Sequence, residues 1–442
     1  MVSHHRGPAR CGGSGASVKR PVRRGFLVDA EDASAIGARA RVIRRRRGLS
    51  LDVVAGLAGI SKSYLGMLEN GKRGFNRRGL LDDLAAALGC SVVDLTGQPC
   101  QPLDRATADA LATLPGISLA INDCTLDDVP DLPTRPAEQL VSAAAAANAH
   151  LDAARFSLAG RGLGALLAEL HVAAVTGDTD IRRAALAALA EACLVGASVA
   201  RHFGHADLAV QTARRGYDAA RRADDLTRAG LLTMHRALGL GWIGARHRVT
   251  AVVNDALAEI TPDPSAKDTG PAQAAGMLHL TAALNYARQN RSSDAEGHLG
   301  RAEELARHAG EGNVLLQHFG PVNVATWGIN IAVELERGPA AAESLHPDAP
   351  RLLDSFRSAV RGGALYLDLA RAYAQAEGDR DREAIQCLDT ADRLAPQYVR
   401  PDPMARELVL TLDRRARRRL WELDSLRNRF GVGTRRPHSV DN

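Results

Sequence analysis

Apolar residues recur at helical spacing along most of this chain, and the pattern is clearest near the N-terminus. Alanine, leucine and isoleucine return every three or four positions over residues 35–47 and 77–88, which predicts a helix in each segment. Between them, residues 50–71 read as two shorter helices, and Gly59 separates the two with the backbone freedom that a sharp turn needs. With a short helix at its end, the pattern predicts a five-helix domain over residues 34–97.

The two short central helices share an apolar stripe that continues across their turn. Ser50 and Ser61 precede them, and a serine hydroxyl at such a position accepts a hydrogen bond from an unpaired backbone N–H. Asn70 and Gly71 then form a typical helix stop. The stripe comprises Val54, Ala58, Ile60, Leu65 and Leu68. This spacing fits two helices crossing at a steep angle, the helix-turn-helix unit.

From residue 137 to residue 430 the pattern is helix after helix. Paired segments such as residues 206–222 and 226–242 alternate small and large apolar side chains. Breaks 40 to 48 residues apart fall at Gly204, Gly244, Asn290, Gly338 and Gly378. A loose period of paired helices is typical of an α-solenoid. The predicted fold class is therefore all-α, with a small helical domain followed by a helical-repeat domain.

Three further segments show no helical period of comparable strength. Residues 1–33 are rich in Gly, Ser, Pro and Arg and are expected to form a disordered basic tail. Residues 98–136 contain six prolines, so we expect a linker with one short helix around residues 105–114. Residues 431–442 are expected to form a second disordered tail.

Charge is distributed unevenly along the 442 residues. Residues 1–97 hold 17 Lys or Arg against 8 Asp or Glu, whereas the remainder has a small acidic excess. A basic small end suggests that a polyanion binds there. The six cysteines show no C-x-x-C spacing, and no metal site is expected. No membrane span or secretory leader is expected either, so the predicted compartment is the cytoplasm, in association with the nucleoid.

Short sequence motifs within the N-terminal domain resemble those of a known family. The order R-R-R-R-G-L-S, A-G-I-S, Y-L-G-M-L-E-N-G-K-R and L-A-A-A-L-G-C-S is similar to the lambda-repressor-like, or Xre-type, DNA-binding domain. The repeat region resembles degenerate tetratricopeptide repeats, best in AGMLHLTAALNYARQNRSSDAEGHLGRAEELARHAG and GALYLDLARAYAQAEGDRDREAIQCLDTADRLAP. The whole arrangement is similar to actinobacterial Xre-type regulators with tetratricopeptide-like sensor domains.

The resemblance implies which residues contact DNA. Base edges would be read in the major groove from the second helix of the pair, by Lys62, Ser63, Tyr64 and Met67. Phosphate contacts fix register without reading sequence. Their expected donors are Ser50, Ser61, Asn70, Lys72, Arg73, Asn76, Arg77 and Arg78. Double-stranded DNA is thus the expected partner, bound by a homodimer.

The repeat domain shows no catalytic motif, so an enzyme is not expected, and no cofactor is expected. Polar and aromatic residues on presumed inner helices suggest a groove for a small-molecule or peptide effector, although ordinary repeat packing explains them as well. They are Trp242, Asn285, Arg288, Asn323, Trp327, Asn330, Tyr366 and Tyr373. Asn323, Trp327 and Asn330 would share one helix face, because they stand at i, i+4 and i+7.

Two functions follow from these patterns. The first is a sequence-specific DNA-binding transcriptional regulator whose repeat domain mediates dimerisation and senses an effector. The alternative is a protein-binding scaffold whose helix-turn-helix domain is degenerate. Leu51 supports the alternative, because the family commonly has a phosphate-binding Gln there. So do Gly56 and Gly66, each of which costs a helix about 0.5–1 kcal/mol relative to Ala.

Overall fold

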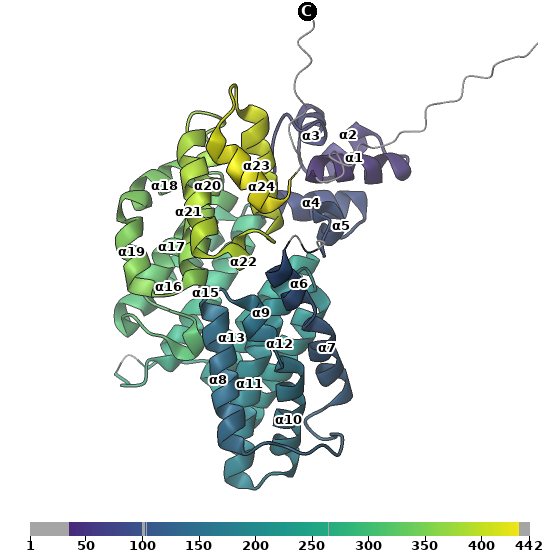
Figure 1. The fold of residues 1–442 in the computed structure, drawn as a ribbon. Helices are drawn as coiled ribbons and strands as arrows, with labels where there is room; N and C mark the ends of the chain where they lie inside the picture. The colour runs from purple at the N-terminus through teal and green to yellow at the C-terminus, as the bar shows by residue number, and fades with distance from the viewer. Residues whose placement is uncertain (1–34, 100–101, 103, 264, 433–442) are drawn as a thin grey trace, which may run out of the picture.

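The computed structural model describes residues 35–99, 102, 104–263 and 265–432, and the predicted tails lie outside this range apart from residues 431–432. The described chain is helical throughout, with no β-strand among these residues (Figure 1). A small N-terminal body, drawn in purple, sits on one end of a much larger array of helices. The all-α prediction is confirmed in both parts.

Five helices form the N-terminal body. They are α1 (Ile36–Arg46), α2 (Leu51–Leu57), α3 (Lys62–Glu69), α4 (Arg78–Leu88) and α5 (Val92–Thr96). Their shared core includes Val54, Leu65 and Leu84, none of which is exposed. The chain bends by 106° between α2 and α3, and Gly59 at the turn has φ +67°, a conformation that favours glycine.

The helical array begins earlier than the sequence indicated. Its first part comprises α6 (Arg105–Leu111), α7 (Leu114–Asp123), α8 (Ala137–Asp152), α9 (Phe156–Gly160), α10 (Leu163–Thr176), α11 (Thr179–His202), α12 (Ala206–Arg222), α13 (Leu226–Ile243), α14 (Arg246–Glu259), α15 (Gly270–Arg288) and α16 (Ser292–Ala309). Residues 98–136 were expected to be a linker, yet Leu114, Ile117 and Ile121 on α7 are buried in the same core as α10 and α11. Pro115 lies in the first turn of α7, where a proline is tolerated, and the other described prolines of this segment lie outside helices, so they do not prevent packing.

The second part of the array carries two short 3₁₀ turns among its helices. Its elements are η2 (Val314–Leu316), α17 (Pro321–Glu334), α18 (Gly338–Leu345), η3 (His346–Asp348), α19 (Ala349–Phe356), α20 (Ala359–Ala374), α21 (Asp381–Leu394), α22 (Pro396–Val399), α23 (Pro403–Arg415) and α24 (Trp421–Phe430). Four of the five predicted breaks lie in left-handed turns, at Gly204, Gly244, Asn290 and Gly378. At the fifth, the left-handed residue is Glu336, and Gly338 begins α18.

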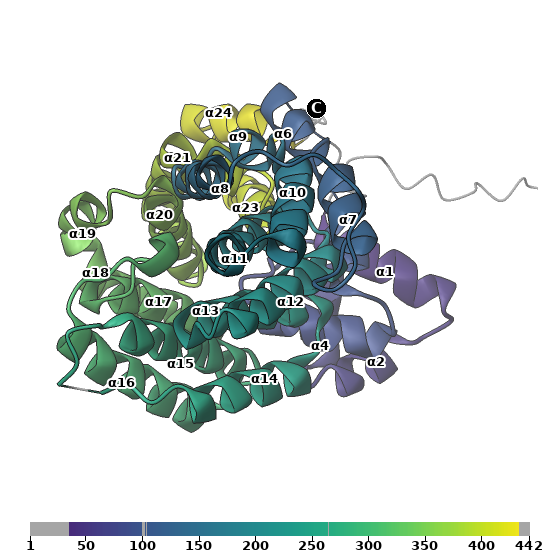
Figure 2. The ribbon, with the colours of Figure 1, turned by 90° about the horizontal axis from the view of Figure 1, so that it is seen from below.

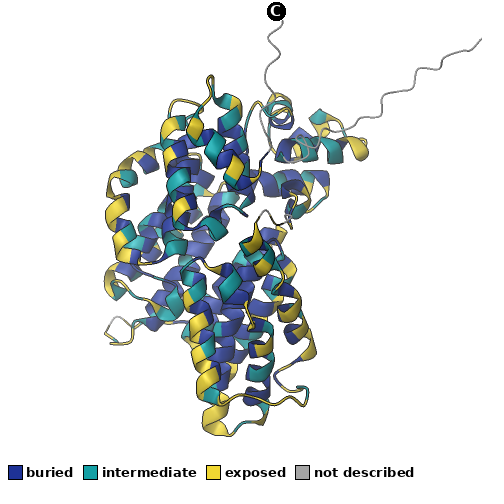
Figure 3. Cartoon of the chain, viewed as in Figure 1, coloured by how far each residue is buried: buried dark blue, intermediate teal, exposed yellow. Residues whose placement is uncertain are grey.

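The array curves until its two ends touch (Figure 2). Tyr398 after α21 stacks on His202 of α11, with ring centroids 5.1 Å apart, and the Ser157 amide donates to Gln397 at 3.1 Å. One continuous core contains residues from both ends, and buried residues line the faces where helices meet (Figure 3). Because first and last helices share this core, the array is a closed ring of helices and not an open arc.

No segment was expected to be apolar enough to span a membrane, but one helix of the ring is. Helix α11 is long and apolar enough to cross a membrane, with a mean hydropathy of 1.5 over its best window. However, 78% of that window is buried inside the protein, between α8, α10, α12 and α13. Its apolar character is therefore accounted for by its central place in the packing.

The N-terminal body is docked against the ring through α1, α4 and the loop before α4. Arg246 of α14 donates to Asp83 at 2.7 Å and to the carbonyl of Gly79 at 2.9 Å. On α23, Glu407 accepts from the Ile36 amide at 3.3 Å, and Met404 joins the core of the N-terminal body. The two parts thus form one packed unit in this structure.

Candidate nucleic-acid interface and the cavity beside it

The start of α3 faces solvent, away from the ring. Lys62 and Ser63 are exposed, whereas Tyr64 and Met67 are half-buried at the edge of the core. The Lys62 ammonium lies 2.8 Å from Asp52, but both side chains are about 60% exposed. An exposed pair of this kind contributes little, about 0–1 kcal/mol, so a stronger acceptor can displace Asp52. Lys62 and Ser63 are therefore accessible, and Tyr64 and Met67 lie on the same helix with part of each side chain exposed.

Capping side chains define where α2 and α3 begin and where α3 ends. The Ser50 hydroxyl accepts from the Val53 amide at 3.2 Å, and the Ser61 hydroxyl accepts from the Tyr64 amide at 3.1 Å. Asn70 closes α3 by donating its side-chain amide to the Gly66 carbonyl at 2.7 Å. Both serines and Asn70 remain exposed, as does Lys72, so half of the predicted phosphate donors face solvent.

The other half of the predicted phosphate donors face the ring. Arg77 forms an ion pair with Glu336 at 3.0 Å, and Arg73 pairs with Glu377. The Asn76 carbonyl accepts from Arg371 at 3.1 Å. Arg78 is 3% exposed, so in this arrangement its guanidinium does not reach a phosphate, contrary to the prediction.

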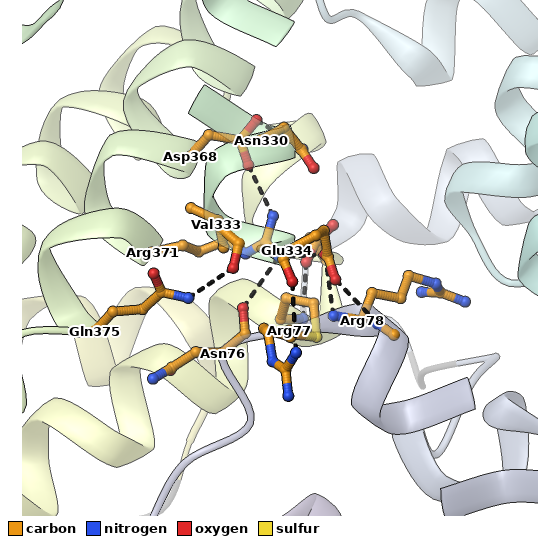
Figure 4. Close-up of polar contacts among 12 residues, drawn as sticks. Asn76, Arg77, Arg78, Asn330, Val333, Glu334, Asp368, Arg371 and Gln375 are labelled. Carbon is orange, nitrogen blue, oxygen red and sulfur yellow. Dashed lines mark hydrogen bonds and ion pairs between the residues drawn. The ribbon is translucent and has the colours of Figure 1, made fainter. Parts of the chain in front are cut away.

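Glu334 at the end of α17 is the centre of this contact (Figure 4). Its two carboxylate oxygens accept from the amides of Arg78 and Gly79, each at 3.0 Å, and Arg371 donates to it at 3.0 Å. Burial raises the pKa of a carboxyl group, but Arg371, Arg288 and the two amides outweigh it, so the pKa of Glu334 lies below its ordinary value. Glu334 therefore carries a buried negative charge at the N-terminus of α4, where the helix dipole favours it.

Arg44 has a structural role that the sequence did not indicate. Four consecutive arginines, Arg44 to Arg47, lie at the end of α1. Arg44 is 8% exposed and forms two hydrogen bonds with Glu69, at 2.6 and 2.7 Å. This pair joins α1 to the end of α3 and fixes the angle at which α3 stands.

Comparison with known families agrees with this geometry. Residues 35–96 match the helix-turn-helix domain family. A steep bend between α2 and α3 with an exposed second helix is the arrangement by which such domains place a helix in the major groove of DNA. No curated protein and no solved structure shows a significant match to the chain. The helix-turn-helix domain is thus identified, and the family match does not extend to the ring.

A cavity lies where the helix-turn-helix domain meets the ring. Its accessible volume is about 230 Å³, and Arg78 of α4 lines it together with residues of α11, α13, α15, α17 and α20. Four of the eight residues predicted to line an effector groove are here, namely Trp242, Arg288, Trp327 and Asn330. These four come from α13, α15 and α17, three helices of the ring that pack against one another in that order.

The remaining four predicted groove residues lie elsewhere. Asn285 donates to Thr250 at 3.0 Å, and Asn323 is fully buried and donates to the Gln317 carbonyl at 3.3 Å. Tyr373 contacts His346 at 3.0 Å, and Tyr366 packs beside the same ring. These four are packing residues, because their polar groups serve to join neighbouring helices.

Sequence reasoning missed the acidic side of the interface. Glu334 follows Asn330 by four positions, so it extends the face that Asn323, Trp327 and Asn330 share. The sequence thus indicates which helix face carries Glu334, but it does not indicate which groups bind the carboxylate. The partner is a pair of backbone amides more than 250 residues away, and backbone amides leave no mark in a sequence.

Proposed function

We propose that this protein is a DNA-binding transcriptional regulator of the Xre type, with tetratricopeptide-like repeats of the actinobacterial kind. In this proposal Lys62 and Ser63 read base edges, while Tyr64 and Met67 contact the bases beside them. The observation that carries it is the exposed start of α3 within an identified helix-turn-helix domain. It would act in the cytoplasm, without enzymatic activity and without a membrane.

The ring would control which arginines are available to DNA. Arg73 and Arg77, two expected phosphate donors, are engaged by Glu377 and Glu336 of the ring. A released arrangement would free both, and it would bind DNA more tightly than the docked arrangement. An effector acts on such an equilibrium only through different affinities for its two states. Binding as a homodimer to a two-fold-related operator is part of the same proposal.

Sequence-selected operator DNA tests the proposal by fluorescence anisotropy at several salt concentrations. Replacing Lys62 and Ser63 together by Ala should reduce the preference for operator over random DNA, by about 1–3 kcal/mol for each hydrogen-bonded base edge that is no longer read. Arg77→Ala should weaken all sequences alike and reduce the salt slope by about 1. Arg301→Ala is the control, because Arg301 is exposed on α16 and pairs locally with Glu304.

Binding to no DNA sequence, or binding without salt dependence, would refute the DNA-binding function. The scaffold alternative would then stand, and the ring would be the part to test for protein partners. A mass measurement on the operator complex tests the homodimer separately. One chain per operator would remove dimerisation from the proposal and leave base reading intact.

A further inference from the structure

The cavity beside the helix-turn-helix domain holds more positive charge than its own acidic residues balance. Five arginines and four acidic residues line it. The guanidinium nitrogens Nε, Nη1 and Nη2 of Arg78 are buried and have no hydrogen-bond partner among the described residues. Arg201 and Arg288 line the same cavity, and the Nε atom of each is buried without a hydrogen-bond partner among the described residues. Unsatisfied buried cations are costly, so the site is arranged for an anion.

The four acidic residues of the cavity are already engaged. Glu334 accepts from two amides and Arg371, and Asp368 accepts from Arg371 and Asn330, each at 2.8 Å. Asp402 caps α23 by accepting from the amides of residues 404 and 405. Asp152 accepts from His318 at 2.9 Å. Asp82, one turn after Arg78 on α4, is outside the lining of the cavity and lies 3.4 Å from Arg246. Its Oδ1 atom is buried without a hydrogen-bond partner among the described residues, and its charge acts on Arg78 from the same helix.

The geometry of Arg78 defines where an anion would sit. Its guanidinium carbon lies 3.6 Å from the centroid of the Trp242 ring, so one flat face is covered by indole. Figure 4 shows the side chain extending away from Glu334. The donors along the edge of a guanidinium match two oxygens of a carboxylate or phosphate. Burial lowers the pKa of Arg78 to about 10 against the opposing charge of Asp82, and nearby Arg288 lowers it further, which still leaves Arg78 charged near neutral pH.

The rest of the lining combines apolar side chains with uncharged polar ones, and the volume of the cavity limits the size of the ligand. Trp327, Leu238, Met277 and Leu284 are among the apolar side chains that line it. The volume of about 230 Å³ is below the roughly 300–1,000 Å³ of pockets for drug-sized ligands, and the ring is closed. A small molecule therefore fits this space better than an extended peptide does.

We propose that this cavity binds a small organic anion, with a carboxylate or phosphate held by Arg78, Arg201 and Arg288 and an aromatic or aliphatic body against the tryptophans. Arg78 belongs to the DNA-binding domain and Arg201 and Arg288 belong to the ring, so the anion joins the two parts. Its binding favours the docked arrangement, because it offsets the repulsion that docking creates between Arg78 and the arginines of the ring. The predicted effect of the anion on DNA binding rests on the proposed function, whereas the anion-binding site itself does not.

Three probes with one aromatic body test the site on the full chain without DNA: 2-naphthoate, 2-naphthyl phosphate and the neutral 2-naphthamide. Calorimetry and thermal melting should show binding of the two anions and little or none of the amide. The tighter anion identifies the headgroup, carboxylate or phosphate. Hydrogen exchange at the Arg78 and Gly79 amides should slow when the anion is bound, because those amides are protected in the docked arrangement.

Arg288→Gln and Arg201→Gln should each weaken anion binding about tenfold or more, the value of one charge-assisted hydrogen bond of about 1.5 kcal/mol. Without ligand, Arg201→Gln should melt at a higher temperature than the unmodified chain, because burial lowers the pKa of Arg201 and the replacement removes this poorly compensated charge. A purely structural arginine would do the opposite. Arg301→Gln is the matched exposed control, and it should change neither quantity.

Equal binding of the amide and the anions would overturn the proposal, as would anion binding that survives both variants. Failure of both anions to bind at millimolar concentration would overturn it too. The comparison of anion with amide needs no variant, so it stands even if a variant fails to fold. A chain that binds naphthoate but no DNA would refute the proposed function alone. Sequence-specific DNA binding without binding of any anion would refute the anion site alone.

Discussion

Replacing Glu334 by Gln should undock the helix-turn-helix domain without unfolding it. The carboxylate accepts the two amides at the start of α4 and the Arg371 guanidinium, and it is 1% exposed (Figure 4). A Gln side chain has one acceptor oxygen, and its NH₂ group would face another donor. Arg371 would lose one of its two anionic partners, since Asp368 still binds it at 2.8 Å.

The expected magnitude follows from these contacts. Removing one partner of a buried charged network costs about 3–5 kcal/mol, because the other charge stays buried. Such a change shifts the docking equilibrium roughly a hundredfold to a few thousandfold toward the released arrangement. The core of the helix-turn-helix domain includes none of these groups, so the domain itself should remain folded.

Hydrogen exchange at the Arg78 and Gly79 amides is the most direct assay. The first amides of a helix have no partner within the helix, and here Glu334 supplies it. Where exchange requires undocking, these two amides should exchange roughly a hundredfold to a few thousandfold faster in Glu334→Gln than in the unmodified chain. Amides in the middle of α4 should keep their protection, because their partners are inside the helix.

Glu336→Gln is the matched control. It lies two residues further along, is 66% exposed and contacts Arg77 at 3.0 Å, so its replacement should cost less than about 1 kcal/mol. If both variants protect the Arg78 and Gly79 amides as well as the unmodified chain does, Glu334 does not hold the two parts together. Loss of protection throughout α4 would show instead that the domain unfolds.

Three further changes test other parts of the structure. Gly79→Ala should undock the domain, because its Cβ would lie 2.3 Å from a carbonyl oxygen of α15, and small-angle scattering would detect the change. Gly56→Ala places a Cβ where nothing lies within 4 Å, so it should stabilise α2 by about 0.5–1 kcal/mol, as measured by thermal melting. Burial lowers the pKa of His202 to about 3, so this one histidine should contribute a loss of about 1.4 kcal/mol of stability per pH unit as the unfolded chain takes up a proton below about pH 6.5. His202→Phe should flatten that slope in urea titrations at about pH 7 and about pH 5, and parallel slopes would contradict the assignment. Glu69→Ala should lower the unfolding free energy of the helix-turn-helix domain by about 3–5 kcal/mol, while replacing Arg44 and Glu69 together by apolar residues should restore most of it, as measured by urea denaturation.

The sequence by itself determined the local structure of the helix-turn-helix domain. The bounds of α1 to α5 agree with the predicted helices to within a few residues, because caps, glycine turns and apolar spacing act over one or two helical turns. The exposed face of α3 followed from the same period. The pair α12 and α13 was predicted for the same reason.

Only the tertiary structure decided which distant groups meet. Closure of the ring places Tyr398 on His202, and docking places Glu334 on the amides of α4 and buries Arg78. Arg78 stands next to Arg77 in the sequence, yet Arg78 lies inside and Arg77 at the rim, because Arg77 has an extended backbone before α4 and Arg78 is the first residue of the helix. Contacts between residues hundreds of positions apart depend on the curvature summed over many helix pairs, and no single segment encodes that sum.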